Sequence, residues 1–581
     1  MYSGKLIVLK FGGSVLRSRD EQFIAAQEIY RWYSDGYRVI AVVSALFGET
    51  DRRLQKIRSI GDEVSENNVA KLVACGERES AAELGLILDE CGLPNSVLFE
   101  SEIGLHTDGS ALDARPVELD AQLLKSQLDQ TPVVVVPGFI GIDPSGSTTL
   151  LGRGGSDLTA LFVAAATNAD RCRLVKDVAG LYEFDPNAGQ QYQPRRFRSL
   201  SWEHAQQLDE CILQPKAVRF AQQNQIEFEV ARPLGDQFTR VGPFPVRYFR
   251  RSVEQAVKLR VGIIGLGTAG LGVARQLNRL NQFVDIVSIG VKNIARHRGN
   301  EFDHLLTDDW REVVNSDCDL IVELVGGTDV ALEIVLTSLE LGKHVVTANK
   351  ALVAGYEKQL VQALATSGRQ LFYSAAVGGA VPMLEMVRWL SQRHEIVELQ
   401  GVLNGTTNFV LGQLASGQSL QEAVALAQQK GLAEGDSARD LDGIDALEKL
   451  VLLSRAAGLP VAAADVERES LAGFLDEQTD PIVSNGVRQV ATLSQDNQIP
   501  KGRIELQNVS IRSFAHSVKG RQNGLLVRTS QSNDLVIVGD GAGRWPTTIS
   551  VVADLLRIGR CAEFRRKTHR ENAEKQRITV R

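Results

Sequence analysis

A short apolar run that leads directly into a glycine-rich turn and a helical pattern limits the possible folds of this chain more than any other feature. Residues 258–277 read KLRVGIIGLGTAGLGVARQL, which places Gly265, Gly267 and Gly270 in a GxGxxG arrangement between a strand and a helix. The first glycine permits a tight bend, the second lets a pyrophosphate approach the backbone, and the third allows close helix–strand packing. The segment predicts a dinucleotide-binding βα unit. The alternative is a glycine-rich turn without a ligand.

The residues around this turn indicate which dinucleotide binds. Thr268 and Ala269 begin the helix, whose free amides and positive dipole end suit phosphate groups. After the next predicted strand, Val284–Val291, the chain has Lys292 and two arginines where an NAD enzyme often has an acidic residue. The missing acid and the nearby bases favour NADPH, or the use of both NADPH and NADH. A solvated basic loop is the alternative.

Strand-like apolar runs alternate with helical stretches in both halves of the chain, which is typical of α/β architecture. The clearest runs are Leu6–Lys10, Val39–Ser44, Val133–Pro137, Leu259–Ile264, Leu320–Leu324 and His344–Ala348. Prolines and clustered arginines interrupt the pattern over residues 236–257, so the main domain boundary is expected there. The densely charged residues 561–581 are expected to form a solvated helix or a frayed tail.

Composition excludes several classes of protein. The 581 residues are too many for one hydrophobic core, so several domains are expected. A formal net charge of −7 indicates no general attraction to nucleic acid or to an anionic membrane. The 6 cysteines form no CxxC pair and suggest neither a disulfide framework nor a zinc site. Because the chain also shows no targeting segment and no long apolar run, we expect a cytoplasmic protein.

A segment in the second half combines several acids with a lysine. Residues 431–458 read GLAEGDSARDLDGIDALEKLVLLSRAAG. Asp442 is expected to cap a helix on which Asp445 and Lys449 stand four residues apart on one face. Glu434 lies on the loop that enters this helix. The acids suit the ammonium group of an amino acid and the lysine suits a reacting oxygen. The alternative is a surface ion pair on a capped helix.

Ordered motifs over residues 258–558 resemble those of homoserine dehydrogenases. Besides the two segments above, they are VVTANKALVAGY, AAVGGAVPML, GVLNGTTNFVL and VIVGDGAGRWPTTISVVADLL. The resemblance implies hydride transfer from NADPH or NADH to the aldehyde carbon of L-aspartate 4-semialdehyde, with a lysine donating the proton. The roles that it implies are catalysis by Lys350 and Lys449, cofactor binding near Asn349 and Gly541, and substrate binding by Glu434, Asp440, Asp445, Gly405 and Thr406.

The resemblance also bears on metal binding and on assembly. Family members often hold a monovalent cation with a glutamate placed before the AxVGG run, and here that position is Ser374. Only the backbone near Val377 remains a candidate for such a cation. The family's substrate domain usually dimerises through an extended sheet, which implies a homo-oligomer, dimer or tetramer, acting on small molecules. Another Rossmann dehydrogenase of amino acids is a third interpretation, which the NGTTN and DLDGIDALEK motifs disfavour.

Residues 1–235 resemble the catalytic domain of aspartokinases, within the amino-acid kinase family. The motifs are KLIVLKFGGSVL, CGERES, GFIGIDPSGSTTLLGRGGSD and LVKDVAGLYEFDPN. The resemblance implies phosphorylation of L-aspartate to 4-phospho-L-aspartate by ATP with Mg²⁺. The implied roles are catalysis by Lys10 and Asp157, aspartate binding by Glu77 and Arg153, and nucleotide binding by Gly12, Gly13, Ser14, Lys176 and Asp177.

The first half also departs from the aspartokinase pattern. Where family members read FGAKVLHP, this chain has LDECILQP, so Cys211 replaces a lysine expected near the phosphates and Gln214 replaces a histidine. Lys176 or Lys216 could supply the missing charge. The two halves follow each other so closely that no regulatory ACT domain is expected. The alternative to an active kinase is a catalytically silent module that binds a ligand or promotes oligomerisation.

These observations predict an α/β protein with three kinds of domain. In order, they are an amino-acid kinase-type αβα sandwich at residues 1–235, a linker at 236–257, a Rossmann NAD(P)-binding domain at 258–385, an α/β substrate and dimerisation domain at 386–535, a segment at 536–560 that returns to the nucleotide-binding domain, and a charged tail at 561–581.

Overall fold

The structure of the chain, a computed structural model, falls into two compact units. Residues 3–90 and 94–254 form the first unit, and the second consists mainly of residues 255–581. The structure describes residues 5–61, 63–185, 194–208, 212–249, 258–430, 432, 438–471, 486–496, 498–531 and 534–560.

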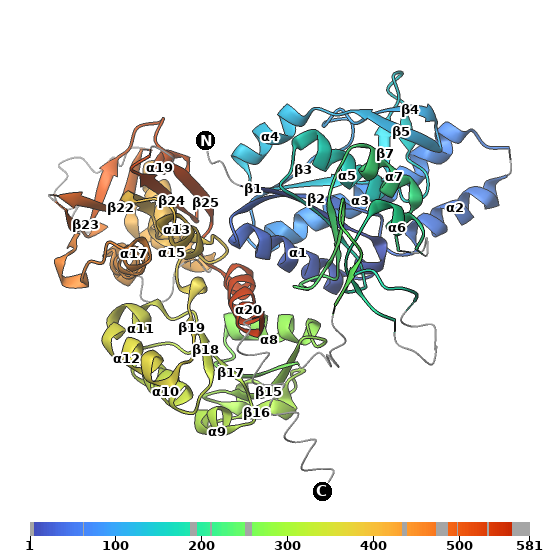
Figure 1. The fold of residues 1–581 in the computed structure, drawn as a ribbon. Coiled ribbons are helices and arrows are strands. Elements are labelled where there is room, and N and C mark those ends of the chain that lie inside the picture. Colours follow the sequence, from blue (N-terminus) through green and yellow to red (C-terminus); the bar gives the residue numbers. More distant parts are fainter. Residues whose placement is uncertain are drawn as a thin grey trace, which may run out of the picture. The chain divides into compact units, whose positions relative to one another are not determined.

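The first unit is built on a nine-stranded sheet with the order β13-β10-β12-β11-β9-β1-β2-β6-β3 (Figure 1). At its centre, β1 (Lys5–Phe11) lies between β2 (Tyr37–Val43) and β9 (Arg171–Val175), and the three strands run parallel. These strands are rich in buried aliphatic residues, as expected for a parallel sheet covered on both faces. The other strands are β3 (Asn95–Val97), β6 (Val133–Pro137), β10 (Phe197–Leu200), β11 (Phe228–Ala231), β12 (Thr239–Val241) and β13 (Arg247–Tyr248).

Helices and a smaller sheet complete this unit. The smaller sheet has the order β5-β4-β7-β8 and consists of β4 (His106–Ser110), β5 (Asp113–Glu118), β7 (Ile140–Ile142) and β8 (Thr148–Leu150). The helices are η1 (Gly13–Val15), α1 (Arg19–Ser34), α2 (Glu49–Ile60), α3 (Glu66–Glu90), α4 (Ala121–Gln130), α5 (Gly155–Thr167), α6 (Trp202–Gln206) and α7 (Pro215–Gln223).

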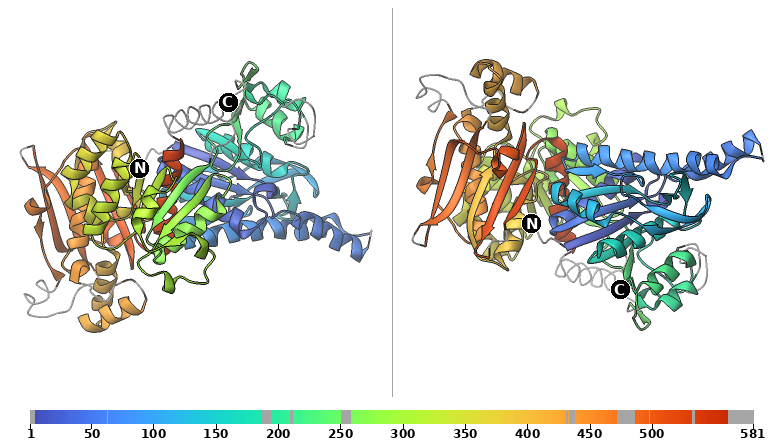
Figure 2. Two further views of the ribbon diagram at one scale, coloured as in Figure 1. Left: turned by 90° about the horizontal axis from the view of Figure 1, so that it is seen from below. Right: turned by 90° about the horizontal axis from the view of Figure 1, so that it is seen from above.

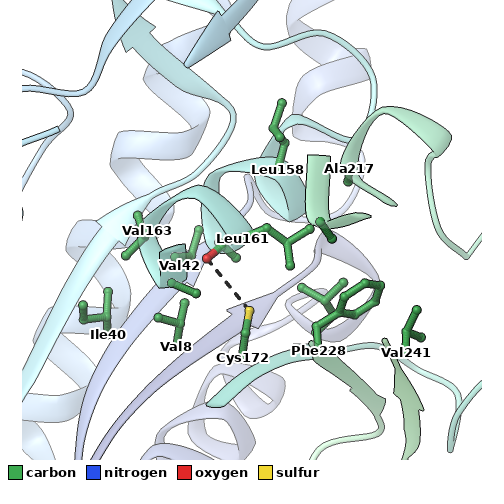
Figure 3. Packing of buried hydrophobic residues seen from close by; sticks show 14 of the residues in the cluster. Val8, Ile40, Val42, Leu158, Leu161, Val163, Cys172, Ala217, Phe228 and Val241 are labelled. Atoms are coloured by element: carbon green, nitrogen blue, oxygen red, sulfur yellow. Dashed lines mark hydrogen bonds between the residues drawn. The ribbon is translucent and has the colours of Figure 1, made fainter. Parts of the chain in front are cut away.

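Helix α5 is anchored to the large sheet by an apolar core. Figure 3 shows Leu161 of α5 packed among residues of the sheet, with Val8 and Val42 in the same cluster. The thiol of Cys172, on β9, donates to the carbonyl of Ala160 at 3.9 Å, and burial raises the pKa of this thiol. This packing fixes the start of α5 at the edge where β1 and β9 end.

The second unit contains a six-stranded parallel sheet with the order β16-β15-β14-β17-β18-β19. Its strands are β14 (Leu259–Ile264), β15 (Val284–Gly290), β16 (Leu306–Thr307), β17 (Leu320–Glu323), β18 (His344–Thr347) and β19 (Leu371–Phe372). Its helices are α8 (Thr268–Arg279), η2 (Ile294–Arg296), η3 (Asp303–Leu305), α9 (Trp310–Asn315), α10 (Asp329–Glu340), α11 (Lys350–Gly355), α12 (Glu357–Ser367) and η4 (Ser374–Ala376). The strand order reverses between β14 and β17, and ligands of such sheets bind at that switch point.

A second six-stranded sheet follows in the same unit, with the order β21-β23-β22-β20-β24-β25. All its neighbours are antiparallel except β21 and β23. Its strands are β20 (Ile396–Val402), β21 (Glu467–Arg468), β22 (Val487–Asp496), β23 (Ile499–Asn508), β24 (Gln522–Thr529) and β25 (Leu535–Asp540). The accompanying helices are α13 (Met383–Ser391), α14 (Gly405–Ala415), α15 (Leu420–Gln429), α16 (Ala438–Leu441), α17 (Ile444–Ala457), η5 (Ala463–Asp465) and α19 (Phe514–Ser517).

Helix α20 (Arg544–Arg560) leaves the second sheet and packs on α8 of the nucleotide-binding part. Figure 1 and Figure 2 both show this red helix beside the green helix α8. A Cβ on Gly272 of α8 would lie 2.4 Å from Oγ1 of Thr548, so the two helices touch where Gly272 has no side chain.

The predicted strand runs are present as β1, β2, β6, β14, β17 and β18. The linker expected at residues 236–257 was partly wrong, because β12 and β13 lie within it and belong to the nine-stranded sheet. The prolines that suggested a linker lie in the turn between these strands, while Thr239 and Val241 are buried. The predicted tail lies outside the described residues. Among the residues described, no helix has the length and apolar character needed to cross a membrane.

Candidate active sites

The turn between β14 and α8 has the geometry that a bound pyrophosphate requires. Gly265 has a φ of 103°, a left-handed conformation that favours glycine, and a Cβ there would lie 2.5 Å from the carbonyl oxygen of Leu324. A Cβ on Gly270 would lie 2.0 Å from the carbonyl oxygen of Gly265, so the helix packs directly on the turn. A Cβ on Gly267 would meet nothing within 4 Å, which leaves open space at the start of α8.

The first turn of α8 fits a dinucleotide phosphate. Gly267 precedes the helix and no side chain caps it, so Thr268 and Ala269 contribute amides that need another acceptor. Beyond β15, Lys292 is exposed and makes no hydrogen bond or ion pair with any described residue. The amides at the start of α8 and the ammonium group of Lys292 are therefore both available to a ligand.

In the second unit, two lysines meet at one carboxylate. Asp445, in the first turn of α17, places Oδ1 2.9 Å from Nζ of Lys350 and Oδ2 2.7 Å from Nζ of Lys449. Lys350 begins α11, just past the carboxyl end of β18. Lys449 stands one turn along α17 and also donates to the carbonyl oxygen of Leu403 at 2.6 Å. The structure thus brings the two lysines that were predicted to be catalytic together across a buried acid.

These contacts determine the charges of the cluster. Burial alone would raise the pKa of Asp445, but the ammonium groups of Lys449 and Lys350 outweigh it and hold that pKa well below its usual range. The negative charge of Asp445 raises the pKa of Lys350, although partial burial opposes it. The side chain of Lys350 is 36% exposed and that of Lys449 only 8%. Lys350 is therefore the protonated lysine that a substrate can reach.

Asn404 organises the acids of this site, although no sequence pattern assigned it a role. Its Nδ2 donates to Oδ1 of Asp440 at 2.7 Å and to Oδ2 of Asp445 at 2.9 Å. Its Oδ1 accepts from the amide of Thr407 at 2.7 Å and so caps α14. Burial raises the pKa of Asp440, which is half-buried. An asparagine placed before a helical run is a cap signal that could have identified this residue.

The predicted pocket residues Gly405 and Thr406 are in the first turn of α14, directly after Asn404. A Cβ on Gly405 would lie 2.3 Å from the carbonyl oxygen of Arg521, so only glycine fits there. The hydroxyl of Thr406 donates to the carbonyl of Leu432 at 2.6 Å. Both residues therefore hold the loop in front of α14 against neighbouring backbone.

Two predicted cofactor residues contact parts of the same site. A Cβ on Gly541 would lie 2.1 Å from Nδ2 of Asn523, which donates to the Leu403 carbonyl that Lys449 also binds. Asn349 caps α11, with its Oδ1 accepting from the third residue of that helix at 3.1 Å. Gly541 and Asn349 thus lie against the backbone next to each lysine that was predicted to be catalytic.

The expected cap of α17 was wrong. The helix begins at Ile444 after Gly443, which has a φ of 70°, and no side chain caps it. The Asp442 carboxylate instead accepts from the hydroxyl of Ser470 at 2.7 Å. The reason is that a separate short helix, α16, places Asp442 in the turn between two helices. Glu434, predicted to bind substrate, lies outside the described residues.

Ser374, at the position where the resemblance suggested a cation-binding glutamate, is hydrogen-bonded to the acid Asp554. Its hydroxyl and its amide donate to the two oxygens of Asp554 at 2.7 and 2.8 Å. Burial, together with the charge of Glu385, raises the pKa of Asp554 to about 7. Among the described residues, no group of three His, Cys, Asp or Glu side chains could hold a metal ion. A cation near Val377 stays a prediction.

In the first unit, a carboxylate again binds two lysines. Asp157, in the first turn of α5, places Oδ1 2.8 Å from Nζ of Lys10 and Oδ2 2.7 Å from Nζ of Lys176. Lys10 lies near the end of β1 and Lys176 directly follows the neighbouring strand β9. Burial would raise the pKa of Asp157, but the two lysines lower it to about 2. Burial lowers the pKa of Lys10 to about 8.

The predicted nucleotide-binding turn follows β1 directly. A Cβ on Gly12 would lie 3.1 Å from Nζ of Lys10, so the backbone passes close to that ammonium group. A Cβ on Gly13 would lie 3.1 Å from the carbonyl oxygen of Ala45. Gly13 and Ser14 begin the short helix η1, which no side chain caps. The amides of this turn are therefore open to a phosphate group beside Lys10.

The remaining predicted kinase residues do not join this cluster directly. Glu77 is buried on α3 and accepts from the amide of Ala45 at 2.7 Å, and burial raises its pKa to about 8. Asp177 pairs with Arg17 at 3.1 Å at the surface. Arg153 is exposed in the turn before α5 and forms no ion pair with any described residue.

The two candidate replacements for the missing family lysine differ in position. Lys216 donates to the carboxylate of Asp113 at 2.5 Å, so its ammonium group is paired with an acid of the smaller sheet. Lys176 instead lies in the cluster with Asp157. Gln214 precedes α7 without capping it, and Cys211 lies outside the described residues. Of the two lysines, Lys176 is the one whose ammonium group reaches the candidate phosphate site.

Comparison with known proteins matches the chain to three families in order. Residues 5–232 match the amino acid kinase family, residues 265–374 match the NAD binding domain of homoserine dehydrogenase, and residues 382–556 match homoserine dehydrogenase.

Individual relatives match the second half of the chain. A homoserine dehydrogenase from Synechocystis sp. is 30% identical over 318 residues, which cover 52% of this chain and 73% of the relative. One from Pseudomonas aeruginosa is 32% identical over 315 residues, covering 52% and 72%. The crystal structure of a homoserine dehydrogenase from Thiobacillus denitrificans is 30% identical, covers 52% of this chain and 74% of its own, and has a TM-score of 0.48. The chain therefore belongs to the homoserine dehydrogenase family and joins that enzyme to an amino acid kinase domain.

Proposed function

We propose that the second unit reduces L-aspartate 4-semialdehyde to L-homoserine with NADPH, or with NADH. The observation that carries this proposal is the pairing of Lys350 and Lys449 with the two oxygens of Asp445. Reduction of a carbonyl needs a proton donor and a positive charge at the oxygen that becomes negative. The cluster supplies both, and the open turn at Gly267 supplies a place for the dinucleotide.

The bound dinucleotide supplies the hydride that adds to the aldehyde carbon. Lys350 then donates a proton to the alkoxide oxygen, which gives the hydroxyl group of the product. Its raised pKa keeps it charged at neutral pH, and its exposure lets water return the proton. Lys449 has a different task, because its buried ammonium group is shared between Asp445 and the Leu403 carbonyl. It holds Asp445 in place so that Oδ1 faces Lys350.

Acids near the lysines suit the ammonium group of an amino-acid substrate. Asn404 binds Oδ1 of Asp440, while Oδ2 of Asp440 has no hydrogen-bond partner among the described residues. Asp440 is half-buried, so a substrate ammonium group can reach that oxygen. Glu434 is assigned to the same task by family resemblance. A zwitterion would thus place its ammonium group at these acids and its aldehyde at Lys350.

The test is a steady-state assay of the intact protein that follows the dinucleotide by absorbance. L-Homoserine should be oxidised with NADP⁺ and more slowly with NAD⁺. L-Serine, which lacks one methylene group, is the matched control and should react at least about tenfold more slowly. Failure to oxidise homoserine with either nucleotide would rule out this function.

We further propose that the first unit phosphorylates L-aspartate with ATP and Mg²⁺. The cluster of Lys10, Asp157 and Lys176 supports this, because it holds one buried and one partly buried positive charge against one negative charge. Such an excess is costly inside a protein unless an anion balances it. A transferred phosphoryl group is such an anion, and these lysines would stabilise its charge. The exposed Arg153 suits a carboxylate of aspartate.

The alternative is a silent module that has kept the fold without the reaction. A hydroxamate assay on the intact protein with ATP and L-aspartate separates the two. Product should form with the wild type and with Lys350→Ala, and should be lost in Lys10→Ala. If the wild type gives no more product than Lys10→Ala, the silent module is the correct interpretation. A cytoplasmic homo-oligomer, dimer or tetramer, stays a prediction, and sedimentation of the intact protein tests the oligomer.

A further inference from the structure

A buried carboxylate joins two loops at the carboxyl edge of the parallel sheet in the second unit. Glu323, the last residue of β17, is 0% exposed. Its Oε1 accepts from the amide of Val325 at 2.8 Å, and its Oε2 accepts from the hydroxyl of Thr347 at 2.5 Å. Neither the sequence motifs nor the proposed reaction uses this group.

These bonds are part of a closed ring that ties the loops after β17 and β18 together. Thr347, the last residue of β18, is paired with Glu323 across the sheet, and its hydroxyl oxygen accepts from the amide of Asn349 at 2.9 Å. Nδ2 of Asn349 donates to the carbonyl of Gly327 at 2.7 Å, which returns the ring to the loop after β17. Each member of the ring therefore helps to hold the two loops together.

The ring lies between the nucleotide turn and the proposed proton donor. On one side, Gly265 packs against Leu324, whose carbonyl oxygen would lie 2.5 Å from an added Cβ. On the other side, Lys350 directly follows Asn349 and begins α11, which Asn349 caps. The ring thus connects the backbone that receives the dinucleotide to the backbone that carries Lys350.

A fully buried carboxyl group such as that of Glu323 is unusual for a residue that only supports a fold. No charged group contributes to its pKa, which burial raises to about 7 against the two hydrogen bonds from Thr347 and Val325. A buried acid without a cation is costly, and an apolar side chain would serve packing better. The two hydrogen bonds use both oxygens of this carboxyl group, so it is the group that holds the ring together.

We propose that Glu323 is a positioning residue for the reduction, whose carboxylate holds Thr347 and, through Asn349, sets the place of Lys350 relative to the nucleotide turn. This inference rests on the proposed function of the second unit. Glu323 does not touch the reacting atoms, so its loss should slow the reaction without removing the groups that carry it out.

The test compares variants of the intact protein. Glu323→Gln keeps the shape, but its single amide oxygen cannot accept from both Val325 and Thr347, and Thr347→Val removes the Thr347 hydroxyl. Each should lower kcat for the semialdehyde about 10- to 100-fold through misplacement of Lys350, while KM for the dinucleotide changes by less than about threefold. Thr347→Ser restores the hydroxyl and should recover most of the turnover.

Two further variants show whether the bond itself matters. The double variant Glu323→Gln, Thr347→Val should be no slower than the slower single variant, because both changes remove the same bond. The matched control is Glu312→Gln, which alters an exposed carboxylate that accepts from the hydroxyl of Thr307 at 2.5 Å in the same sheet. Its turnover should equal that of the wild type.

Normal kcat in Glu323→Gln would overturn the proposal, and so would additive losses in the double variant. A lower melting temperature with unchanged kcat would also overturn it, since that outcome assigns Glu323 to folding alone. If the wild type does not reduce the semialdehyde, the proposed function fails and this proposal fails with it. An active wild type beside an equally active Glu323→Gln variant overturns this proposal alone.

Discussion

Lys449 contacts Oδ2 of Asp445 at 2.7 Å from one turn further along the same helix, and its side chain is only 8% exposed. Both partners of this ion pair therefore lie on α17, and the pair does not depend on the nucleotide-binding part. It leaves Oδ1 of Asp445 for Lys350, the first residue of α11 in the nucleotide-binding part. The two lysines share one acid but depend on it differently.

Alanine substitution should separate the two lysines. Lys350→Ala and Lys449→Ala should each lower turnover at least about a hundredfold, because each removes a charge next to the reacting oxygen or its support. Only Lys449→Ala should also lower the melting temperature, since it removes the buried cation from Asp445, which keeps Lys350 and Asn404, and leaves the Leu403 carbonyl with one donor fewer. Lys358→Ala, at an exposed lysine of α12, is the control. Near-normal turnover would remove that lysine from the chemistry.

Two glycines of the nucleotide turn should respond in opposite ways. Gly270→Ala puts a Cβ 2.0 Å from a carbonyl oxygen, so it should lower the melting temperature of the protein without ligand. Gly267→Ala meets nothing within 4 Å, so it should leave that temperature unchanged. It should still weaken NADPH binding at least about tenfold, because the methyl group occupies the path of the pyrophosphate. Calorimetry and fluorescence titration measure the two effects, and equal behaviour of the variants would refute the assignment.

Lys292 should set the preference between the two dinucleotides. Lys292→Ala is expected to raise KM for NADPH about tenfold, because it removes a cation from the 2′-phosphate, and to leave KM for NADH nearly unchanged. Because Lys292 is exposed, its replacement should leave the melting temperature unchanged. A parallel change in both KM values would place the 2′-phosphate elsewhere.

Asp157→Asn should affect the first unit alone. It leaves Lys10 and Lys176 close together without their acid, which should abolish hydroxamate formation and destabilise this unit by about 3–5 kcal/mol. The folded pKa of Asp157 is lowered to about 2, so the stabilisation is present above its ordinary pKa and is lost as the pH falls through about 2. The melting temperatures of wild type and variant should therefore converge in acid. Loss of dehydrogenase turnover in this variant would contradict the expectation that the substitution affects the first unit alone.

Asp554 should have the opposite dependence on pH. Its folded pKa is raised to about 7, so its contribution is most favourable below its ordinary pKa and becomes less favourable as the pH rises through about 7. Between the ordinary pKa of the group and about 7, each pH unit lowers the free energy of unfolding by at most roughly 1.4 kcal/mol. Asp554→Asn should remove this slope while the amide still contacts Ser374. An unchanged slope in thermal melts between pH 5 and 8 would show that another group causes it.

Local patterns in the chain predicted much of the fold and part of the site. The spacing of Gly265, Gly267 and Gly270 is sufficient to specify the turn, and a spacing of four residues is sufficient to pair Asp445 with Lys449. Both relationships are set within one or two consecutive elements.

Contacts between distant segments could not be predicted in the same way. Glu323 is buried because β18 lies beside β17, and no periodicity along the chain reveals that neighbour. Asn404 reaches two acids on helices that follow much later in the sequence. Asp442 had the pattern of a helix cap, but the short helix α16 in front of it changed its position. In each case the partner was decided by tertiary packing.

The packing of α20 on α8 has a consequence for how the protein is made. The helix that begins with Thr268 loses part of its cover unless residues 544–560 are present, and the whole second sheet is synthesised between them. During synthesis, the packing of the nucleotide-binding part therefore stays incomplete until residues 544–560 have been translated. A chain released before residue 544 would leave the face of α8 at Gly272 uncovered, even though it contains every residue of the glycine-rich turn.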